Sequence, residues 1–562
     1  MLSYKPMIQD KISENLAISL EKIGIKNAPV DLSRPTNPAF GDYTTSVALK
    51  LTKDLKKTPL DIAKIIVKNL EKDEDIEKIK IMEPGFINFW LTDNTLVKEA
   101  KIISTTKKFG QENKKLLLEF GQPNTHKIPH IGHLFSYIYG ESLARILETV
   151  GNTVTKVNYQ GDIGLHVAKC LYKARTEKSK LKSLKTLREK VDFLQYCYQE
   201  GSTAYENDKK AQEEIDDLNQ KIYQKDSSIL ALWQETRQWN IDFYQAFEKE
   251  LGINYQHYYF ESQTAEIGKK IVLDNVGKVF EKSEGAIIFP GKKYGLHTRV
   301  FINKYGNPTY EAKDIGLAAL KKNENRFDYS IITTASEQND YWKVVKKAIE
   351  LVFPDMLGKI THIGFGMINL TTGKMASRTG QILDPFTLIN QVKKSIAEDY
   401  KITDEVLLGK IVFAAIKYSF LNSDPKKNII FDLKKSIAKE GNSGPYLLYT
   451  YVRCQSVLKK AQIFNPQSQI QIANLKIEEK EILRQIVHFS EIVKQTAVNF
   501  APNTIATFIF ELAQKYNLFY QKNPILKADE PTKNFRLFLT ATVANILKQG
   551  LYLLGIETVE KI

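Results

Sequence analysis

Residues 116–134 read Leu-Leu-Leu-Glu-Phe-Gly-Gln-Pro-Asn-Thr-His-Lys-Ile-Pro-His-Ile-Gly-His-Leu. The apolar run at 116–118 is typical of a strand that is buried on both faces. A helix is predicted over about 130–150 and a second strand over 153–159. Strand, crossover helix and strand form the βαβ unit of a parallel nucleotide-binding sheet, whose ligands sit beyond the carboxyl ends of the strands. This stretch predicts an α/β fold of the Rossmann type.

The rest of the chain divides into parts with different periodicity. Helical patterns at 8–23 and 60–70 with a strand at 85–91 predict a small α/β domain. A β-rich stretch at 285–308 and strands near 329–334 and 362–368 resume the nucleotide-binding domain. Helical periodicity fills the chain after about 400. We expect an N-terminal α/β domain over 1–110, a Rossmann-type catalytic domain over 111–390 with a helical insertion at about 170–250, connecting stem helices over 391–436 and a C-terminal α-helical bundle over 437–562.

Composition narrows the class of protein. The formal charge of +15 favours polyanionic partners such as RNA, although a lysine-rich, AT-rich genome would explain it equally well. The three cysteines, Cys170, Cys197 and Cys454, are too scattered for a metal site or a disulfide framework. We find no signal peptide and no membrane span. We therefore expect a cytoplasmic protein with no membrane contact and no resident metal.

The histidine-rich loop carries the strongest chemical signal. His130 and His133 lie one turn apart at the start of the predicted helix, where imidazole N–H groups can donate to phosphate oxygens. Gly132 lacks a Cβ, so a flat ring such as adenine could lie against the backbone there. The alternative is a polar loop with incidental histidines, which the strand-to-helix context disfavours.

A basic loop later in the same domain forms the second signal. Residues 373–380 read Gly-Lys-Met-Ala-Ser-Arg-Thr-Gly. Such a loop can fold over a triphosphate and place Lys374 on the charge that grows as pyrophosphate leaves. In isolation, a surface turn would be the better interpretation. Together with the histidine loop, we interpret it as catalytic.

These two elements resemble the HIGH and KMSKS signatures of class I aminoacyl-tRNA synthetases. Further segments resemble the arginyl-tRNA synthetase family in particular, and they occur in order from near the start of the chain to its end: Asn-Pro-Ala-Phe-Gly-Asp-Tyr at 37–43, Asn-Tyr-Gln-Gly-Asp-Ile-Gly at 158–164, Tyr-Glu-Ala-Lys-Asp-Ile at 310–315, Gly-Asn-Ser-Gly-Pro-Tyr-Leu-Leu-Tyr at 441–449 and Gly-Leu-Tyr-Leu-Leu-Gly-Ile-Glu at 550–557. A shared fold alone would not produce matches over the whole chain.

The resemblance implies an arginine–tRNA ligase that uses ATP with Mg²⁺ and acts on L-arginine and tRNA(Arg) through an arginyl-adenylate. It implies a monomer. His130 and His133 would bind the phosphates, Gly132 the adenine and Met375 the nucleotide. Lys374 and Arg378 would stabilise the leaving pyrophosphate.

The resemblance also assigns the amino-acid site. Tyr310 and Asp314 are four residues apart, so on a helix they share one face and can close on one ligand. The family pattern maps arginine recognition onto this pair and Gln338, with Glu119 and Asn124 near the α-amino group. Without that context, a surface tyrosine and a solvated aspartate would be the better interpretation.

The sequence departs from the family pattern at several positions. The loop at 373–380 lacks the second lysine of KMSKS, and Ile163 stands where the family has tryptophan. Lys127 lies where arginyl enzymes with degenerate loops carry a compensating lysine, so the resemblance implies a catalytic role for it.

Both ends of the chain resemble tRNA-binding domains. The N-terminal domain is similar to one that docks on the outer corner of tRNA, and its Phe-Gly-Asp-Tyr at 40–43 could contact tRNA or form an internal turn, which we favour. Single-stranded bases are usually read by aromatic stacking and edge contacts. In the C-terminal domain the candidate readers are Asn442, Tyr446, Tyr449 and Tyr520, although aromatic residues at helical spacing are often core residues.

Two alternatives remain open at this point. A catalytically silent RNA-binding paralogue would keep the fold and lose the chemistry, and the altered loop at 373–380 favours it. A class I enzyme that adenylates another amino acid or a small acid without tRNA would leave the long C-terminal bundle without a purpose. Binding of arginine, directed by Tyr310, Asp314 and Gln338, separates these from an arginyl enzyme.

Overall fold

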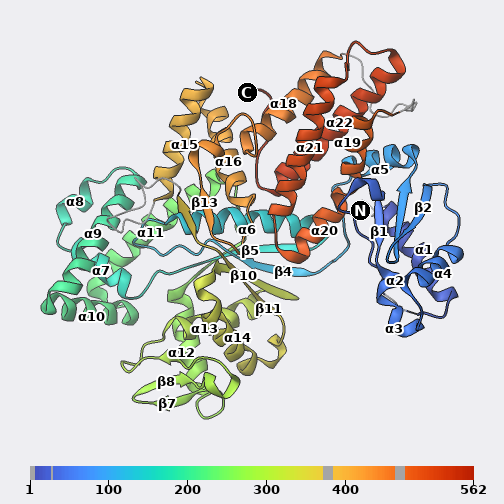
Figure 1. Ribbon diagram of the computed structural model, residues 1–562. Helices are drawn as coiled ribbons and strands as arrows, with labels where there is room; N and C mark the ends of the chain where they lie inside the picture. The colour runs from blue at the N-terminus through green and yellow to red at the C-terminus, as the bar shows by residue number, and fades with distance from the viewer. Residues whose placement is uncertain (1–6, 27–28, 371–383, 462–474) are drawn as a thin grey trace.

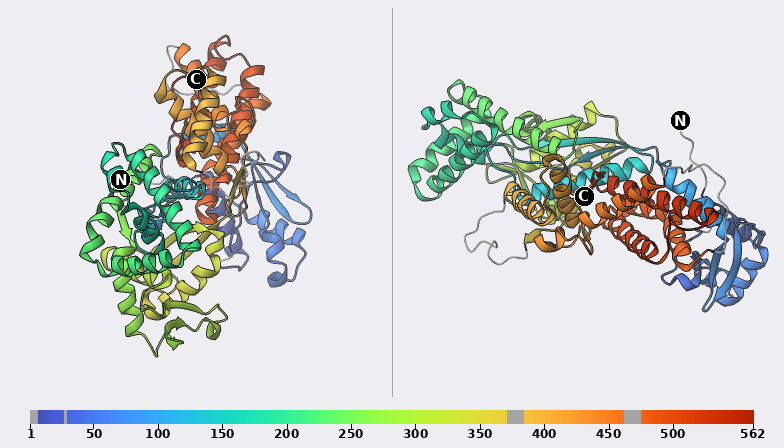
Figure 2. Two further views of the ribbon diagram at one scale, coloured as in Figure 1. Left: turned by 90° about the vertical axis from the view of Figure 1, so that its left-hand side faces the viewer. Right: turned by 90° about the horizontal axis from the view of Figure 1, so that it is seen from above.

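The structure is a computed structural model that describes residues 7–26, 29–370, 384–461 and 475–562. Four parts of the molecule lie around a central sheet (Figure 1). These are a helical insertion, a lower lobe of helices and short strands, the C-terminal helical bundle and the N-terminal domain beside that bundle. Seen from above, the molecule is elongated, with the insertion at one end and the N-terminal domain at the other (Figure 2).

The central sheet has five parallel strands in the order β11-β10-β4-β5-β6. The strands are β4 (Lys115–Glu119), β5 (Thr153–Gln160), β6 (His257–Phe260), β10 (Tyr329–Ala335) and β11 (Ile360–Phe365). Leu117 lies opposite Thr155 of β5 on one side and Ser330 of β10 on the other. The order reverses between β4 and β10, so the carboxyl ends of these strands border the crevice in which such sheets bind ligands.

Helices cover the sheet and form the insertion. The crossover between β4 and β5 is α6 (Ile131–Thr149). Between β5 and β6 the chain forms α7 (Leu165–Ala174), α8 (Lys178–Ser183), α9 (Leu187–Asn207), α10 (Lys209–Gln224) and α11 (Ser227–Glu250). Helix α9 starts with a capping box, in which the Thr186 hydroxyl accepts from the Glu189 N–H and the Glu189 carboxylate accepts from the Thr186 N–H.

The lower lobe completes the catalytic domain. It contains α12 (Glu261–Asp274), β7 (Glu281–Ser283), β8 (Ala286–Phe289), η2 (Gly291–Tyr294), β9 (Arg299–Ile302), α13 (Tyr310–Glu324), η3 (Ser336–Gln338), α14 (Asn339–Val352) and η4 (Pro354–Met356). Strands β7, β8 and β9 form an antiparallel sheet. Helix α13 connects this sheet to β10, so its first residues lie at the carboxyl ends of the central strands.

The N-terminal domain is a three-stranded antiparallel sheet in the order β1-β3-β2, with helices packed against it. Its elements are α1 (Ile8–Lys22), η1 (Pro38–Phe40), β1 (Tyr43–Thr45), α2 (Val47–Lys50), α3 (Thr52–Leu55), α4 (Pro59–Asn69), β2 (Ile76–Met82), β3 (Phe86–Leu91) and α5 (Asp93–Thr105). Helix α5 leads from this domain to β4.

The C-terminal half is mostly helical. It contains β12 (Ile368–Leu370), α15 (Pro385–Tyr400), α16 (Glu405–Leu421), β13 (Ile429–Phe431), α17 (Leu433–Ser436), α18 (Gly444–Lys460), α19 (Ile477–Val487), α20 (Phe489–Asn499), α21 (Asn503–Lys522) and α22 (Glu530–Leu553). Strands β12 and β13 pair in parallel.

The predicted α/β class with a Rossmann-type sheet, a small N-terminal α/β domain and a C-terminal helical bundle is confirmed. The predicted strands at 116–120, 153–159 and 329–334 correspond to β4, β5 and β10 within one or two residues. Strands β1, β2, β6, β7 and β13 were not predicted. The β-rich stretch at 285–308 forms the antiparallel strands β8 and β9, and the predicted strand at 362–368 is divided between β11 and β12. The residues of β2 do not alternate strictly between buried and exposed positions, so they give no strand pattern in the sequence. Strand β13 has only three residues, which are too few for a periodic signal.

Buried polar contacts join the catalytic domain to the C-terminal bundle. The Tyr139 hydroxyl of α6 donates to the carbonyl of Phe500 at 2.8 Å. The buried Lys417 amine of α16 donates to the carbonyls of Leu251 and Gly555, at 2.8 and 2.6 Å. Leu251 follows α11 and Gly555 follows α22, so this ammonium lies at the C-terminal ends of two helices, where the helix dipole is negative.

Glu248 of α11 is a buried carboxyl group with hydroxyl and amide partners. Its Oε1 accepts from the Tyr137 hydroxyl at 2.9 Å and the Asn158 amide at 2.7 Å, and its Oε2 accepts from the Tyr258 hydroxyl at 2.6 Å. Burial raises the pKa of Glu248 to about 7, although these three donors act in the opposite direction. The folded protein therefore binds a proton at Glu248 that the unfolded chain releases near pH 4.5.

We predict that Glu248→Gln stabilises the folded protein at pH 8 and has little effect at pH 5. Between pH 4.5 and about 7 the folded state holds the extra proton, so the contribution of Glu248 to the free energy of unfolding falls as the pH rises. The full shift corresponds to about 3 kcal/mol. Urea unfolding at pH 5 to 8 measures the difference, with Glu235→Gln on the exposed face of α11 as the control. A difference between Glu248→Gln and wild type that is the same at pH 5 and pH 8 would contradict this.

Candidate active site

The loop after β4 turns the chain sharply toward α6. Gly121, Gln122 and His126 have positive φ angles of 91°, 53° and 62°. The Gly121 N–H donates to the Ser136 hydroxyl at 2.9 Å, and the Gln122 N–H donates to the Asn158 amide oxygen at 3.1 Å. These bonds hold the turn in a region of backbone space that residues other than glycine seldom adopt. The turn sets where His130 begins α6.

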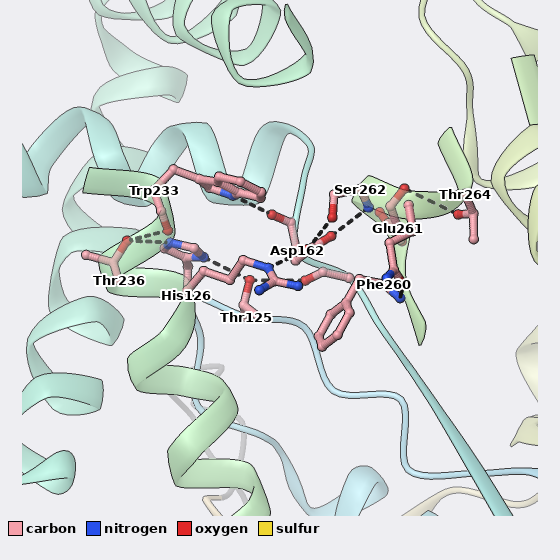
Figure 3. Close-up of polar contacts among 12 residues, drawn as sticks. Thr125, His126, Asp162, Trp233, Thr236, Phe260, Glu261, Ser262 and Thr264 are labelled. Atoms are coloured by element: carbon pink, nitrogen blue, oxygen red, sulfur yellow. Dashed lines mark hydrogen bonds and ion pairs between the residues drawn. The ribbon is translucent and has the colours of Figure 1, made fainter. Parts of the chain in front are cut away.

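His126 points into the protein interior. Its Nδ1 lies 2.9 Å from the Thr125 hydroxyl, its Nε2 lies 2.9 Å from the Thr236 hydroxyl, and its backbone N–H donates to Asn240 at 2.9 Å. Figure 3 shows the ring held between the loop and helix α11. Desolvation, with Arg237 nearby, lowers the pKa of His126 to about 3. His126 is thus a neutral anchor for the loop and is not available to a ligand.

His130 and His133 form a reciprocal cap at the start of α6. Nδ1 of His130 accepts from the Gly132 N–H at 3.1 Å, and Nδ1 of His133 accepts from the His130 N–H at 3.1 Å. Desolvation lowers the pKa of both rings, and the nearby Lys127 ammonium adds to the effect. Because each Nδ1 accepts a bond, the proton of each neutral ring must sit on Nε2. The helix N-terminus therefore presents two Nε2–H donors, which suits an anion.

Gly132 gives His130 room to form this cap. A Cβ on Gly132 would lie 2.9 Å from both Cε1 and Nδ1 of the His130 ring. Any larger residue would displace the ring. The absence of a side chain at 132 thus has a structural reason, in addition to the contact with a flat ligand ring that the sequence suggests.

Lys127 lies on the same loop with its amine against an aromatic ring. Its Nζ is 4.7 Å from the centre of the Tyr198 ring of α9. The Lys127 carbonyl accepts from the Tyr244 hydroxyl at 2.7 Å and from the Asn240 amide at 3.2 Å, which fixes the backbone. In the part of the chain that the structure describes, Lys127 forms no ion pair. Its charge therefore remains available to an anion beside His130.

Carboxylates gather at the carboxyl ends of the strands, and most have an internal cation. Glu119, at the end of β4, is buried, pairs with Lys321 of α13 and accepts from the Gln122 side chain at 2.7 Å. Glu261, directly after β6, pairs with the buried Lys313 at 2.6 Å.

Asp162 follows β5 and has a larger network. It pairs with Arg237 at 2.6 Å and accepts from the Ser262 N–H at 2.8 Å and hydroxyl at 2.6 Å, while the Trp233 indole donates to its carbonyl at 2.8 Å. Figure 3 shows Asp162 between α11 and the start of α12. Asp162 therefore fixes the insertion against the sheet.

Asp314 of α13 differs from these carboxylates. Its Oδ2 accepts from the Tyr341 hydroxyl, and among the described residues it forms no ion pair. Desolvation and the nearby carboxylates of Glu119 and Glu261 raise the pKa of Asp314 to about 8. An incoming cation would lower that pKa and would replace the missing partner.

The other predicted ligand residues lie around Asp314 and the loop. The Tyr310 ring is 57% exposed at the start of α13, with the Lys313 amine 5.0 Å from its centre. Gln338 is exposed at the end of η3, after β10. Asn124 lies on the loop after β4, where its carbonyl accepts from the Tyr244 hydroxyl at 2.6 Å. Glu119 ends β4 and is followed by the loop to His133, Gln338 follows β10, and Tyr310 and Asp314 lie at the start of α13. All of these predicted residues are thus at the carboxyl-end side of the central sheet.

The predicted residues of the basic loop, Lys374, Met375 and Arg378, lie outside the described residues. The chain before them ends in β12, which pairs with β13, and the chain after them enters α15.

In the C-terminal bundle two of the four predicted residues meet at one cation. Arg453 of α18 lies 4.8 Å from the centre of the Tyr449 ring and 5.0 Å from that of Tyr520. The rings are 45% and 41% exposed. A cavity of about 320 Å³ adjoins Arg453 and Tyr520 and is also lined by Lys460 and Lys527. Arg453 was not predicted, because no local pattern identifies it.

Tyr446 and Asn442 make internal contacts. The Tyr446 hydroxyl accepts from the Asn517 amide at 2.9 Å, and its ring packs edge-on against Phe510. The Asn442 amide oxygen accepts from the Tyr418 hydroxyl, although Asn442 itself is exposed.

Sequence reasoning also missed Glu261, Lys313 and Lys321. Glu261 is the first residue after β6, so the rule that ligands lie at the carboxyl ends of parallel strands would have identified it. The two lysines face inward from α13, and their sequence context does not separate them from Lys322, the more exposed lysine of the same helix.

Three family models match the chain. The model described as "Arginyl tRNA synthetase N terminal domain" covers residues 7–91, "tRNA synthetases class I (R), catalytic domain" covers 93–433, and "DALR anticodon binding domain" covers 447–562.

Curated relatives match over nearly the full length. The chain is 30% identical over 553 residues to the arginine–tRNA ligase of Fusobacterium nucleatum, covering 95% of each chain. It is 29% identical over 605 residues to that of Flavobacterium psychrophilum, covering 99% of this chain and 98% of the relative. The solved arginyl-tRNA synthetase of Thermus thermophilus has the same fold, with a TM-score of 0.82, 23% identity and coverage of 99% and 100%.

The described residues contain neither a membrane-spanning helix nor a metal-binding cluster. No helix there is long and apolar enough to cross a membrane. No group of three or more histidine, cysteine or acidic residues in those ranges could hold a metal ion.

We predict that His130 and His133 are both neutral Nε2–H tautomers between pH 6 and 8. Each Nδ1 accepts a backbone hydrogen bond, and desolvation keeps the rings neutral. Imidazole ¹⁵N spectra, assigned with His130→Gln and His133→Gln, would show an unprotonated Nδ1 and a protonated Nε2 for each, with exposed His297 as the internal reference. A protonated Nδ1 in either ring would overturn the proposed cap.

Proposed function

Because the chain belongs to the arginyl-tRNA synthetase family, it is a class I ligase that uses ATP to attach arginine to tRNA, and we propose which of its residues carry that reaction. The family model of the catalytic domain covers residues 93–433, which include the whole central sheet. The observation that carries the assignment of the amino-acid site is Asp314, a carboxyl group at the carboxyl ends of the strands that has no cation among the residues the structure describes.

ATP binds over the start of α6. The Nε2–H groups of His130 and His133 donate to phosphate oxygens at the positive end of the helix, and the adenine lies near Gly132. Lys127 contributes a cation beside His130. Lys374 and Arg378 stabilise the pyrophosphate as it leaves, and Met375 contacts the nucleotide.

Mg²⁺ accompanies ATP in this proposal. The carboxylates of Glu119, Asp162 and Glu261 already have internal cations, and no metal-binding group occurs among the described residues. The phosphates of the nucleotide would hold the ion, which would supply charge neutralisation there.

Arginine binds with its guanidinium group at Asp314. Tyr310 and Gln338 lie at the neighbouring strand ends and complete the side-chain contacts, while Glu119 and Asn124 face the α-amino group. Glu119 is already paired with Lys321, so the amino group would share that carboxylate. Glu261 is already paired with Lys313, so it adds no free charge there. A neutral amino acid would leave the buried Asp314 with only the Tyr341 hydroxyl and no cation among the described residues, which gives strong discrimination without an editing site.

The reaction proceeds in two transfers. An oxygen of the arginine carboxylate attacks the α-phosphorus of ATP, the bond to the β-phosphate bridging oxygen breaks, and arginyl-adenylate and pyrophosphate form. A terminal ribose hydroxyl of tRNA then attacks the arginyl carbonyl, loses its proton and releases AMP. The enzyme forms no covalent intermediate, so its residues act by positioning and by stabilising charge.

tRNA(Arg) contacts both ends of the protein. The N-terminal domain docks on its outer corner, and the bundle binds the anticodon. Tyr449, Tyr520 and Arg453 form an exposed aromatic and cationic cluster beside the cavity of about 320 Å³, which suits an unstacked base and its phosphate. Tyr446 supports this cluster through Asn517, which also accepts from Arg453 at 2.5 Å, and the exposed Asn442 remains a candidate tRNA contact. As the family resemblance implies, we propose a monomer that acts in the cytoplasm.

Pyrophosphate exchange into ATP tests the function. We expect exchange that requires arginine and, as the family resemblance implies, tRNA. Exchange driven by another amino acid and not by arginine would support the enzyme of different specificity. No exchange in any condition, with RNA binding intact, would support the silent paralogue and would overturn the proposal.

We predict that Lys127→Ala reduces arginine-dependent exchange about a hundredfold and leaves tRNA affinity within about twofold. The amine lies beside His130 and compensates for the second lysine that the loop at 373–380 lacks. Lys169→Ala is a matched control, because the Lys169 amine stacks on Tyr205 at 4.5 Å in the same insertion but away from the loop. Equal losses of exchange and tRNA affinity would refute a catalytic role for Lys127.

We predict that the KM for arginine falls as the pH rises toward 8, by up to about tenfold per pH unit. The free carboxyl group of Asp314 has a pKa of about 8, so below that pH a proton must leave before the guanidinium binds. Asp314→Asn should raise the KM at least thirtyfold, about 2 kcal/mol, and remove the slope. Asp355→Asn, at an exposed ion pair with Lys322, is the control. A wild-type KM for arginine that is flat from pH 6.5 to 8.5 would contradict this role.

A further inference from the structure

Helix α19 presents a row of polar side chains to the N-terminal domain. Lys480, Arg484 and His488 are spaced four residues apart, so they share one face of the helix. Lys480 pairs with Asp93 at 2.6 Å, and Arg484 pairs with Asp42 at 2.9 Å. Figures 1 and 2 show the N-terminal domain beside the bundle at this point.

The centre of this contact is the Phe-Gly-Asp-Tyr segment at 40–43. The Asp42 N–H donates to the Phe89 carbonyl at 2.8 Å, and its Oδ2 accepts from the Leu91 N–H at 2.8 Å. Gly41 has a φ of 107°, and a Cβ there would lie 2.6 Å from the Phe89 carbonyl oxygen. The segment is therefore pressed against β3, and Oδ1 of Asp42 faces Arg484.

Asp42 and Tyr43 are inaccessible to an external ligand. The Asp42 side chain is 1% exposed, and Tyr43 is fully buried with its ring edge-on to His488 at 4.9 Å. Burial raises the pKa of Asp42, and Arg484 acts against that shift. A carboxylate buried between two domains is tolerated because the other domain supplies its cation.

Further hydrogen bonds and one aromatic contact join the two domains around this ion pair. Arg34 of the N-terminal domain donates to the Gln485 side chain of α19 at 2.9 Å. The Gln549 side chain of α22 donates to the Ser104 carbonyl at the end of α5, at 2.8 Å. Phe489 packs edge-on against Phe109 at 5.5 Å, where the chain leaves the N-terminal domain.

We propose that Asp42 and Arg484 are positioning residues that lock the N-terminal domain onto the helical bundle, so that the two RNA-contacting parts of the enzyme hold tRNA at a fixed separation. The inference rests on the proposed tRNA contacts of both parts. Asp42 and Tyr43 of the Phe-Gly-Asp-Tyr segment thus form an interdomain contact and are closed to RNA, whereas Phe40 is 41% exposed. Neither residue touches substrate, and both act through the placement of the surfaces that do.

Single and double substitutions in the full-length enzyme test this. Asp42→Asn keeps the shape of the side chain and removes its charge, and Arg484→Gln removes the cation from the opposite domain. Each should raise the KM for tRNA about tenfold with kcat and the KM values for ATP and arginine unchanged. The double variant should be no worse than either single variant, because the two residues act as one pair. Arg484→Lys, which keeps the charge, should restore most of the affinity.

Two further readouts distinguish the interdomain lock from a local effect of each substitution. Fluorescence energy transfer between dyes on α4 and α21 should report a broader distance distribution in both single variants than in wild type. Asp93→Asn, at the half-exposed pair with Lys480, should change the KM for tRNA less than twofold. If Asp42→Asn raises the KM and Arg484→Gln does not, Asp42 serves its own domain and the interdomain lock is wrong. If the wild type charges tRNA and neither variant changes the KM for tRNA or the distance distribution, the interdomain lock alone is wrong. If the wild type fails to charge tRNA, the proposed function is wrong.

Discussion

The reversal of strand order beside β4 is the constraint on which the site depends. The chain extends the sheet through β5 and β6 and then returns to place β10 on the other side of β4. The loops that leave β4 and β10 therefore diverge, and a crevice opens between them. The loop after β4 carries His130 and His133, and the chain around β10 supplies Asp314 and Gln338. Because of this one topological feature, His130 and Asp314, which are nearly two hundred residues apart in the sequence, lie at the same edge of the sheet.

Charge is distributed unevenly around that crevice. Lysines and an arginine from α11 and α13 neutralise Glu119, Asp162 and Glu261, whereas within the described ranges Asp314 has a hydroxyl donor and no cation. Buried carboxylates are costly unless they are paired, so an unpaired one is stable mainly in its protonated form until a cation arrives. In the proposed function, this absence of a cation beside Asp314 among the described residues is the basis of the selectivity for a guanidinium group.

The helix that carries the two histidines also joins the distant domains. Helix α6 begins at the cap formed by His130 and His133, and near its other end Ser142 donates to the Leu553 carbonyl of the bundle at 2.8 Å. The bundle in turn contacts the N-terminal domain through Arg484 and Asp42. A single packed path therefore connects the start of α6, where we propose that phosphates bind, with the two parts that we propose contact RNA. In that proposal, such a rigid connection sets the geometry in which a tRNA can bridge the cluster of Tyr449, Arg453 and Tyr520 and the crevice.

Local pattern in the sequence determined the strand, helix and strand of 116–159, the position of His130 and His133 at a helix start, and the common helix of Tyr310 and Asp314. These depend on periodicity and on neighbours within a few residues, which a sequence displays directly. Tertiary structure alone decided that His126 faces inward, that Asp314 lacks the cation its neighbours have, that Arg453 joins Tyr449 and Tyr520, and that Asp42 meets Arg484. The partners in most of these contacts lie tens to hundreds of residues apart, so their identity depends on how the elements pack and not on any local pattern.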